Sequence, residues 1–256
     1  ILADDTAGSV RALEKIVPMQ RADFVGMLRM MESLPVTIRL FDPPLHEFLP
    51  QTDQDLEDLA KKLNVSTERL RTKRNVLYEL NPILGHRGCR LGITFPEIYE
   101  AQVQAIMEAA CELTLEGVEV RPEIMVPLVG HRRELEILRE RIAHVCAEVI
   151  AAQGATPHYT IGTMIEVPRA ALRADHIAEV ADFFSFGTND LTQMTLGLSR
   201  DDSGRFLPDY VAQGIFPQDP FATLDQDGVG QLIELAVKKG RAIREGLKIG
   251  ICGEHG

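Results

Sequence analysis

The sequence predicts an α/β fold, a (β/α)8 barrel of the TIM type, and three observations lead to this prediction. Short apolar segments alternate with longer helical patterns along the chain, which is typical of a parallel sheet covered by helices. Six such segments can be counted, near residues 36, 88, 124, 161, 183 and 248. Polar and charged residues follow several of them, as expected where the carboxyl ends of barrel strands carry the chemistry.

Six segments are two fewer than a complete barrel needs. The sequence opens with a helical pattern over residues 4–33, interrupted at Pro18, and it closes on a strand at 247–252 with no helix after it. We therefore expect one partial barrel domain over residues 1–256, cut at both ends and lacking the first and the last strand.

Between these ends, each strand is expected to lead into a helix. A short strand over 36–40 is followed by a helical insertion at about 51–80, with helices at 53–63 and 66–80 that begin on Asp53 and on Ser66 or Thr67. The helix from Pro96 has an apolar face at helical spacing, as does the helix after the strand at 123–128. The stretch 197–227 lacks periodicity and is rich in Asp, Gly, Pro and Ser, so we expect a long loop that serves the site. The residues expected in the two apolar faces are Val103, Ile106, Met107, Ala110 and Leu113, and Leu135, Leu138, Ile142, Val145 and Val149.

Composition narrows the classes of protein. The 256 residues are 45% hydrophobic, enough for one barrel or two small domains. A net charge of -11 disfavours a nucleic-acid partner. The sequence has no run of about 18 apolar residues, so no membrane span is indicated. The four cysteines show no C-x-x-C pair, which favours a reducing, cytosol-like compartment, with Cys111 and Cys146 buried within helices.

Two strand ends each present one carboxylate, Glu166 after 161–165 and Asp190 after 182–186. A right-handed crossover brings both ends to one edge of the sheet, where a pair of hard oxygens suits Mg²⁺ with open positions. The turn Gly187, Thr188, Asn189 adds backbone amides, a hydroxyl and an amide beside Asp190, a combination apt for an oxyanion. The alternative is that either acid caps a helix or lies on the surface.

Basic and thiol groups complete the predicted site. Arg39 ends a short buried strand and needs an anion, either a substrate or a salt-bridge partner such as Asp42. Arg87 or Arg90 could join it, with surface charge as the alternative. Cys252, in a glycine-rich end, would donate or accept a proton, with His255 the next candidate, unless it is a buried strand-end cysteine.

Several long motifs in this sequence closely resemble the phosphoenolpyruvate-binding barrel of the PEP-utilising enzymes. These are IGTMIEVPRA at 161–170, SFGTNDLTQ at 185–193 and GICGEHG at 250–256. VTIRLFDPPLHEFLP at 36–50, the insertion after it, and GHRGCRL at 85–91 resemble the phosphate-dependent dikinase branch of that family. The resemblance covers nearly the whole sequence.

The resemblance implies phosphoryl transfer between a histidine of a separate swivelling domain and pyruvate or phosphoenolpyruvate. By motif, Glu166 and Asp190 would hold Mg²⁺, and Arg39 and Arg87 would bind the phosphoryl and carboxylate groups. Cys252 would protonate the enolate at its methyl carbon. The substrate contacts implied by the same motifs are Gly187, Thr188 and Asn189.

The resemblance also implies partners and a location. The intact enzyme would contain the phosphohistidine domain and an ATP-grasp domain, and without them this sequence should not complete the ATP, phosphate and pyruvate reaction. A homodimer through the barrel is expected, in the cytoplasm, or in a plastid if the source is a plant. Alternatives are the sister enzymes pyruvate, water dikinase and the sugar-phosphotransferase phosphocarrier enzyme, a Mg²⁺-dependent carbon-carbon lyase, and a non-catalytic scaffold barrel.

Overall fold

The structure is a computed structural model that describes residues 5–50 and 52–256. Its regular elements, in chain order, are α1 (Thr6–Leu13), α2 (Val17–Met30), β1 (Pro35–Arg39), η1 (Leu45–Phe48), α3 (Asp53–Leu63), α4 (Thr67–Leu77), η2 (Pro82–Leu84), α5 (Gly88–Thr94), α6 (Pro96–Leu115), β2 (Arg121–Val126), α7 (Arg132–Gln153), β3 (Thr160–Ile165), α8 (Pro168–Leu172), α9 (Ala174–Ala178), β4 (Phe183–Gly187), α10 (Thr188–Leu196), η3 (Ser203–Arg205), α11 (Leu207–Ala212), the π-helical turn η4 (Gln226–Gly230), α12 (Gln231–Ile243) and β5 (Lys248–Cys252).

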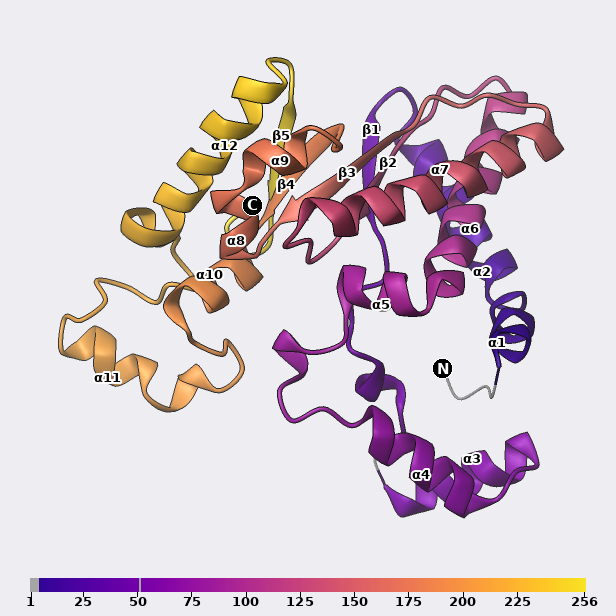
Figure 1. The fold of residues 1–256 in the computed structure, drawn as a ribbon, viewed down its shortest axis with the longest axis horizontal. Helices are drawn as coiled ribbons and strands as arrows, with labels where there is room; N and C mark the ends of the chain where they lie inside the picture. Colours follow the sequence, from indigo (N-terminus) through magenta and orange to yellow (C-terminus); the bar gives the residue numbers. More distant parts are fainter. Residues whose placement is uncertain (1–4, 51) are drawn as a thin grey trace.

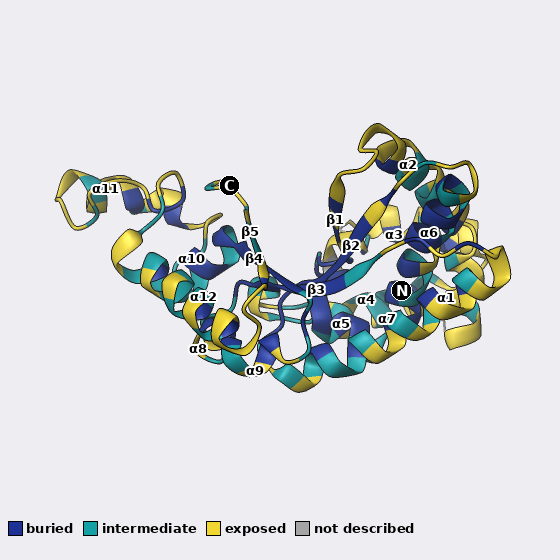
Figure 2. Cartoon of the chain, turned by 90° about the horizontal axis from the view of Figure 1, so that it is seen from above, coloured by how far each residue is buried: buried dark blue, intermediate teal, exposed yellow. Residues whose placement is uncertain are grey.

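The five strands form one parallel sheet whose spatial order, β1-β2-β3-β4-β5, is also their order in the chain. Each crossover connection therefore leads to the neighbouring strand in the same direction, and the helices lie on one side of the sheet. Figure 2 shows the sheet curled into an open trough, with helices along its convex side. The predicted α/β class is confirmed, and the architecture is a curled half-barrel consistent with part of a TIM-type barrel.

One predicted strand is wrong. The segment at 88–92 is the helix α5, because β1 and β2 pair directly in register, from Pro35 with Arg121 to Arg39 with Met125, and leave no place for a strand between them. Gly88 turns the chain with φ 56°, and the Cys89 amide then donates to the Pro127 carbonyl at 3.1 Å. As helix α5, the segment packs beside α6 and α7 and so buries its apolar residues.

The strands alternate strictly between two faces, as the pleat of a β-strand requires. One set of side chains enters the main core with the helices, and both predicted apolar helix faces contribute to it, although Val145 is only partly buried. Cys111 and Cys146 are fully buried, as expected. The strand residues on this convex, helix-covered face are Val36, Ile38, Ile124, Val126, Ile161, Ile165, Phe184 and Phe186.

An ion pair crosses the concave face of the sheet. Lys248 Nζ on β5 lies 2.6 Å from Glu123 Oε1 on β2, and the other Glu123 oxygen accepts from Thr37 Oγ1 at 2.7 Å. Strands β2 and β5 are separated by two others in the sheet. This contact can form only because the sheet is strongly curled, so it reports the curvature directly.

The predicted helical insertion is present as α3 and α4, which project away from the sheet in Figure 1. The two helices share a small core of Leu56, Ala60 and Leu70. Helix α4 begins after Ser66, as expected, whereas the cap of α3 is Thr52 and not Asp53. Thr52 and Asp55 form a capping box that satisfies two backbone donors at once.

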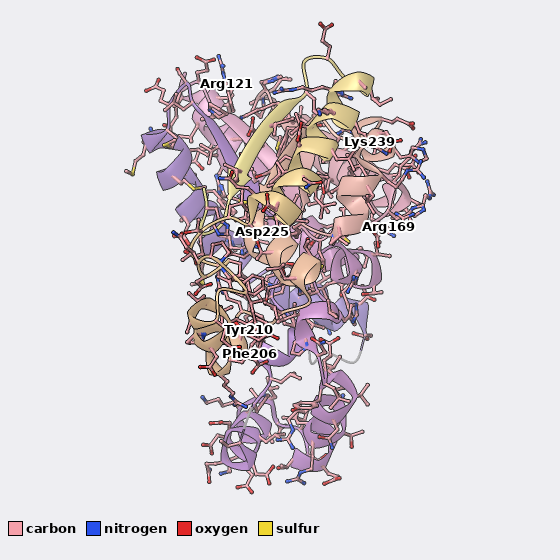
Figure 3. The ribbon with its side chains drawn as sticks, turned by 90° about the vertical axis from the view of Figure 1, so that its left-hand side faces the viewer. Arg121, Arg169, Phe206, Tyr210, Asp225 and Lys239 are labelled. Carbon is pink, nitrogen blue, oxygen red and sulfur yellow. The ribbon has the colours of Figure 1, made fainter. Side chains whose placement is uncertain are left out.

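The stretch 197–227 is more ordered than a plain loop. It contains η3 and α11. The ring of Tyr210 on α11 lies 5.3 Å from that of Phe206 and 5.7 Å from that of Phe216, and Figure 3 labels Phe206 and Tyr210 close together. This aromatic cluster gives the segment an internal core.

Among the described helices, none is long and apolar enough to span a membrane.

Candidate active site

The concave face of the trough, at the carboxyl ends of the strands, holds the predicted site residues. Alternation along each strand places Arg39 on β1, Gly187 on β4 and Cys252 on β5 on this face, and Gly187 pairs with Cys252 in register. Ile165 pairs with Phe186, so Glu166 lies beside Gly187. The order across the sheet is therefore carboxylate, glycine, thiol.

Glu166 is the most deeply buried charged side chain of the site, with 1% of its surface exposed. Its Oε1 accepts from the Leu128 amide at 2.6 Å, and a Cβ on Gly187 would collide with its Oε2. Burial, followed by the charges of Asp190 and Asp42, raises the pKa of Glu166 to about 8, while the Leu128 amide and the Arg87 charge act in the opposite direction. A cation beside these carboxylates would relieve this unfavourable charge.

Leu128 holds an unusual conformation to make that contact. It lies directly after β2, is almost fully buried, and has φ 62°, in the left-handed region that a branched side chain rarely adopts. Its carbonyl accepts from Cys89 Sγ at 3.3 Å. The strained residue thus joins the site carboxylate to helix α5, and the sequence carries no local signal for it.

Two arginines and two aspartates form a chain of ion pairs next to Glu166. Arg39 contacts Asp42 at 3.1 Å, Arg87 contacts the same Asp42 oxygen at 3.4 Å, and Arg87 contacts Asp190 at 2.5 Å. The salt bridge between Arg39 and Asp42 that the sequence suggested is present. Burial raises the pKa of Asp42 even though both arginines lower it. Arg90, in contrast, donates to two backbone carbonyls, so Arg87 is the arginine that reaches the site.

The turn after β4 is tied to the end of β5. Thr188 Oγ1 donates to the Cys252 carbonyl at 3.0 Å, and Asn189 Oδ1 accepts from the Glu254 amide at 3.2 Å. The partly buried Cys252 thiol accepts from Ser185 Oγ and donates to the Phe186 carbonyl, both at 3.5 Å. These contacts fix the thiol beside the Gly187 turn.

A cavity of about 350 Å³ lies between these groups. It brings together every site residue that the motifs implied except Arg87, which reaches the cavity through its contact with Asp190; the candidates Arg90 and His255 do not line it. The residues that line it are Arg39, Met125, Met164, Glu166, Gly187, Thr188, Asn189, Asp190, Cys252 and Gly253.

A wider cavity of about 740 Å³ adjoins the first and shares Arg39, Asn189 and Asp190 with it. Arg87 and Arg200 both line this wider cavity. Arg200 also forms an ion pair with Glu254 at 3.1 Å. The sequence interpretation missed Arg200, because it lies in the long segment after α10 that has no strand end to mark it.

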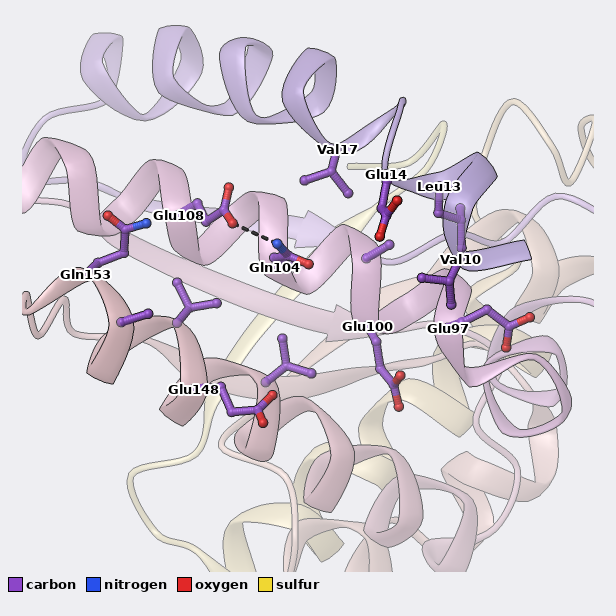
Figure 4. Close-up of a pocket in the computed structure, with 14 residues that line it drawn as sticks. Val10, Leu13, Glu14, Val17, Glu97, Glu100, Gln104, Glu108, Glu148 and Gln153 are labelled. Carbon is purple, nitrogen blue, oxygen red and sulfur yellow. Dashed lines mark hydrogen bonds between the residues drawn. The ribbon is translucent and has the colours of Figure 1, made fainter. Parts of the chain in front are cut away.

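Figure 4 shows a different groove, of about 400 Å³, between α1, α6 and α7. Val10, Val17 and Val149 are among its apolar lining residues, and Glu97 and Glu148 among its acidic ones. It contains none of the predicted site residues. The residues that the sequence predicted for the site therefore lie on the concave face of the sheet and not in this groove.

Within residues 5–50 and 52–256, no group of three or more His, Cys, Asp or Glu side chains is arranged to hold a metal. Glu166 and Asp190 are a pair without a third acidic ligand. Hard carboxylate oxygens with open positions suit Mg²⁺, which retains water and takes substrate oxygens as ligands. The donor set fits that ion, provided that substrate and water complete its coordination.

The chain matches a family model described as PEP-utilising enzyme, PEP-binding domain, over residues 5–256. It is 58% identical to pyruvate, phosphate dikinase of Rhizobium meliloti (strain 1021) and 52% identical to that of Clostridium symbiosum, in each case over 100% of this chain and 29% of the relative. It is 56% identical to the chloroplastic pyruvate, phosphate dikinase 1 of Arabidopsis thaliana, over 100% of this chain and 27% of the relative. The chain thus spans less than a third of the length of these relatives. Because the match covers nearly every residue, the chain belongs to the PEP-utilising enzyme family and corresponds to its PEP-binding domain.

Proposed function

We propose that this chain binds pyruvate and phosphoenolpyruvate and hosts Mg²⁺-dependent phosphoryl transfer between pyruvate and a phosphohistidine of a separate domain, as part of a pyruvate, phosphate dikinase. The observation that carries the proposal is the convergence of a guanidinium, two carboxylates and a thiol on one 350 Å³ cavity. A three-carbon acid presents the groups that this set can recognise: a carboxylate, a carbonyl and a methyl carbon.

Charge neutralisation is the first task of the site. Arg39 and Arg87 would bind the carboxylate and phosphoryl groups, since a guanidinium donates two parallel hydrogen bonds to such anions. Asp42 contacts both arginines and holds them side by side before substrate arrives. Such preorganised charge, together with positioning, supplies most of the catalysis in phosphoryl transfer.

Glu166 and Asp190 would hold Mg²⁺ beside the substrate. When bound, the ion supplies positive charge that stabilises an enolate oxygen and the phosphoryl oxygens. Gly187, Thr188 and Asn189 would contact the substrate from the turn that carries Asp190. The Leu128 amide keeps Oε1 of Glu166 occupied at 2.6 Å, which orients the carboxylate toward Gly187.

Cys252 would move the proton at the methyl carbon. In the direction of phosphoenolpyruvate, the thiolate takes a methyl proton, the electrons of that C–H bond form the carbon-carbon double bond, and the carbonyl oxygen takes the negative charge. That oxygen then attacks the phosphorus atom, and the histidine nitrogen leaves with the electrons of the P–N bond. In reverse, the thiol returns the proton to the enolate carbon.

The larger context is also a proposal. Residues 1–256 would form one partial (β/α)8 domain that lacks the first and the last strand, with the helical insertion at about 51–80. A phosphohistidine domain and an ATP-grasp domain of the same enzyme would supply the phosphoryl group. A homodimer through the barrel, and a cytoplasmic or plastid location, complete the proposal. The length of the dikinase relatives supports this arrangement.

The test is exchange of the pyruvate methyl protons with deuterated solvent, followed by NMR on the complete protein that contains this chain. We expect exchange that requires Mg²⁺ and phosphate and is lost in Cys252→Ala. Cys146→Ala is the matched control, because Cys146 is a fully buried thiol on the opposite face of the sheet. Exchange should persist in this variant.

Two results would contradict the proposal. If a folded protein that binds Mg²⁺ and oxalate, a mimic of the enolate, shows no exchange, the chain does not enolise pyruvate. If exchange persists in Cys252→Ala, another group moves the proton, and His255 would be tested next.

A further inference from the structure

Two methionines face the same cavity as the charged groups, and the proposed function leaves them without a role. Met125 on β2 and Met164 on β3 are 5% and 3% exposed and belong to a small cluster on the concave face, separate from the main core. Cys252 packs against this cluster. Apolar side chains therefore lie directly beside the proposed proton-transfer group.

The register of the strands places Met164 one inward-facing position below Glu166. Glu166, Gly187 and Cys252 form the upper level, at the carboxyl edge of the sheet. Inward-facing residues two positions earlier form the level beneath it, and there Met164 pairs with Ser185. Gly187 has no side chain, and Glu166, Cys252 and Met164 all line the cavity around it.

Met164 has little freedom to withdraw. A Cβ on Gly187 would lie 2.5 Å from its terminal methyl, so that methyl already fills the space beneath the glycine. Met125 pairs with Arg39 in register and lines the cavity on the β1 side. The two thioether side chains together form an apolar floor under the place where a substrate carbon would meet Cys252.

We propose that Met125 and Met164 determine specificity by setting the size limit at the substrate carbon that exchanges protons with Cys252. The floor accepts the methyl group of pyruvate and the methylene group of phosphoenolpyruvate, and it rejects 2-oxo acids whose chain is longer by one carbon. This inference rests on the proposed function and extends it to the choice of substrate. The charged groups of the cavity recognise the carboxylate and carbonyl that all these acids share, and the floor faces the carbon at which the acids differ.

The test compares pyruvate with 2-oxobutanoate in the complete protein. Deuterium exchange at carbon 3 of each acid is measured by NMR, and the ratio of the two kcat/KM values is the readout. We expect Met164→Ala to shift this ratio toward 2-oxobutanoate by about 10- to 200-fold, the range that one methylene group contributes in an apolar pocket. Oxalate has no carbon beyond its carboxylates, so Mg²⁺-dependent oxalate binding, measured by calorimetry, should change by less than about threefold, well under the discrimination that one methylene provides.

Met107→Ala is the matched control, since Met107 is a fully buried methionine of the main core on α6. It should leave the ratio unchanged. Met125→Ala is a second variant of the floor and keeps the test available if Met164→Ala does not fold.

Each outcome has one meaning. If the wild-type protein does not exchange pyruvate protons at all, the proposed function fails, whatever the methionines do. If the wild type exchanges pyruvate but neither floor variant gains activity toward 2-oxobutanoate, the size-limit inference is overturned. An equal gain in Met107→Ala would also overturn it, because general loosening of the barrel would then explain the shift.

Discussion

Replacing Glu166 with Gln should stabilise the protein in the absence of Mg²⁺ and substrate. The Glu166 side chain is almost fully buried, and burial with the nearby charge of Asp190 raises its pKa to about 8. Glutamine has the same shape, its oxygen can keep the 2.6 Å hydrogen bond from the Leu128 amide, and its amide group can face Asp190 as a donor. The variant therefore keeps the contacts of the site and removes the cost of a buried charge.

The expected gain depends on pH in a definite direction. The folded protein holds the Glu166 proton more tightly than the unfolded chain does. The contribution of this proton to the free energy of unfolding is therefore fully present below about pH 4.5 and is lost as pH rises toward about 8. One pKa unit corresponds to about 1.4 kcal/mol, so a rise from 4.5 to about 8 sets an upper limit of about 5 kcal/mol. Relaxation of the site and water entry lower this limit, and we expect about 1–3 kcal/mol at pH 8 and almost none at pH 4.5.

Urea unfolding of wild type and Glu166→Gln between pH 4.5 and 8.5 measures the difference. Addition of Mg²⁺ with oxalate should stabilise the wild type and leave the variant unchanged, because ligands stabilise only the state that binds them. A variant that is less stable than wild type at pH 8 would refute the reasoning. So would a stability difference that does not change with pH.

Three further predictions follow from contacts described above. Gly187→Ala would add a methyl group against two buried side chains of the site, and calorimetry should show oxalate binding weakened about tenfold or more, the effect of an overpacking cost above 1.4 kcal/mol; unchanged binding would mean that the glycine is not needed for space. Arg87→Met leaves buried carboxylates without their main partner and should lower the free energy of unfolding by about 3–5 kcal/mol in urea; adding Asp42→Asn should restore part of the loss, and no recovery would argue against Arg87 as the partner of Asp42. A double-mutant cycle on Glu123→Gln and Lys248→Met should give a coupling of about 1 kcal/mol, reduced because Lys248 is half exposed, and a coupling near zero would show that this pair does not hold the curl.

The sequence predicted the fold class because the alternation of strands and helices is a local signal. All five observed strands lie where the pattern placed a strand, and the sixth predicted strand, near 88, is a helix. The helix α5 could not be predicted in the same way. Its seven residues, with glycines and β-branched Ile93 and Thr94, are too few to show a helical period. What decides its structure is non-local: β1 and β2 already pair with each other, and the carbonyls of Pro127 and Leu128 accept hydrogen bonds from the amide and the thiol of Cys89 at the start of the helix.

The site could be predicted where a carboxylate or a thiol ends a strand, as with Glu166 and Cys252. Asp42 was visible only as a partner for Arg39, although it also contacts Arg87 from 45 residues away. Leu128 could not be found at all, because its contribution is a backbone amide set by a left-handed φ angle, and an ordinary apolar residue gives no sign of that. Strand ends mark the groups proposed to react, whereas the groups that orient them depend on tertiary structure.

The ion pair between Lys248 and Glu123 closes a ring. Strands β2 to β5 are joined in series by backbone hydrogen bonds, so small errors in each pairing would add up, and Cys252 at the end of the series would carry their sum. The ion pair across the concave face joins β5 to β2, the two ends of that series, at 2.6 Å. A closed ring of this kind limits the accumulated error and restrains the distance between the thiol on β5 and the strand that carries Met125.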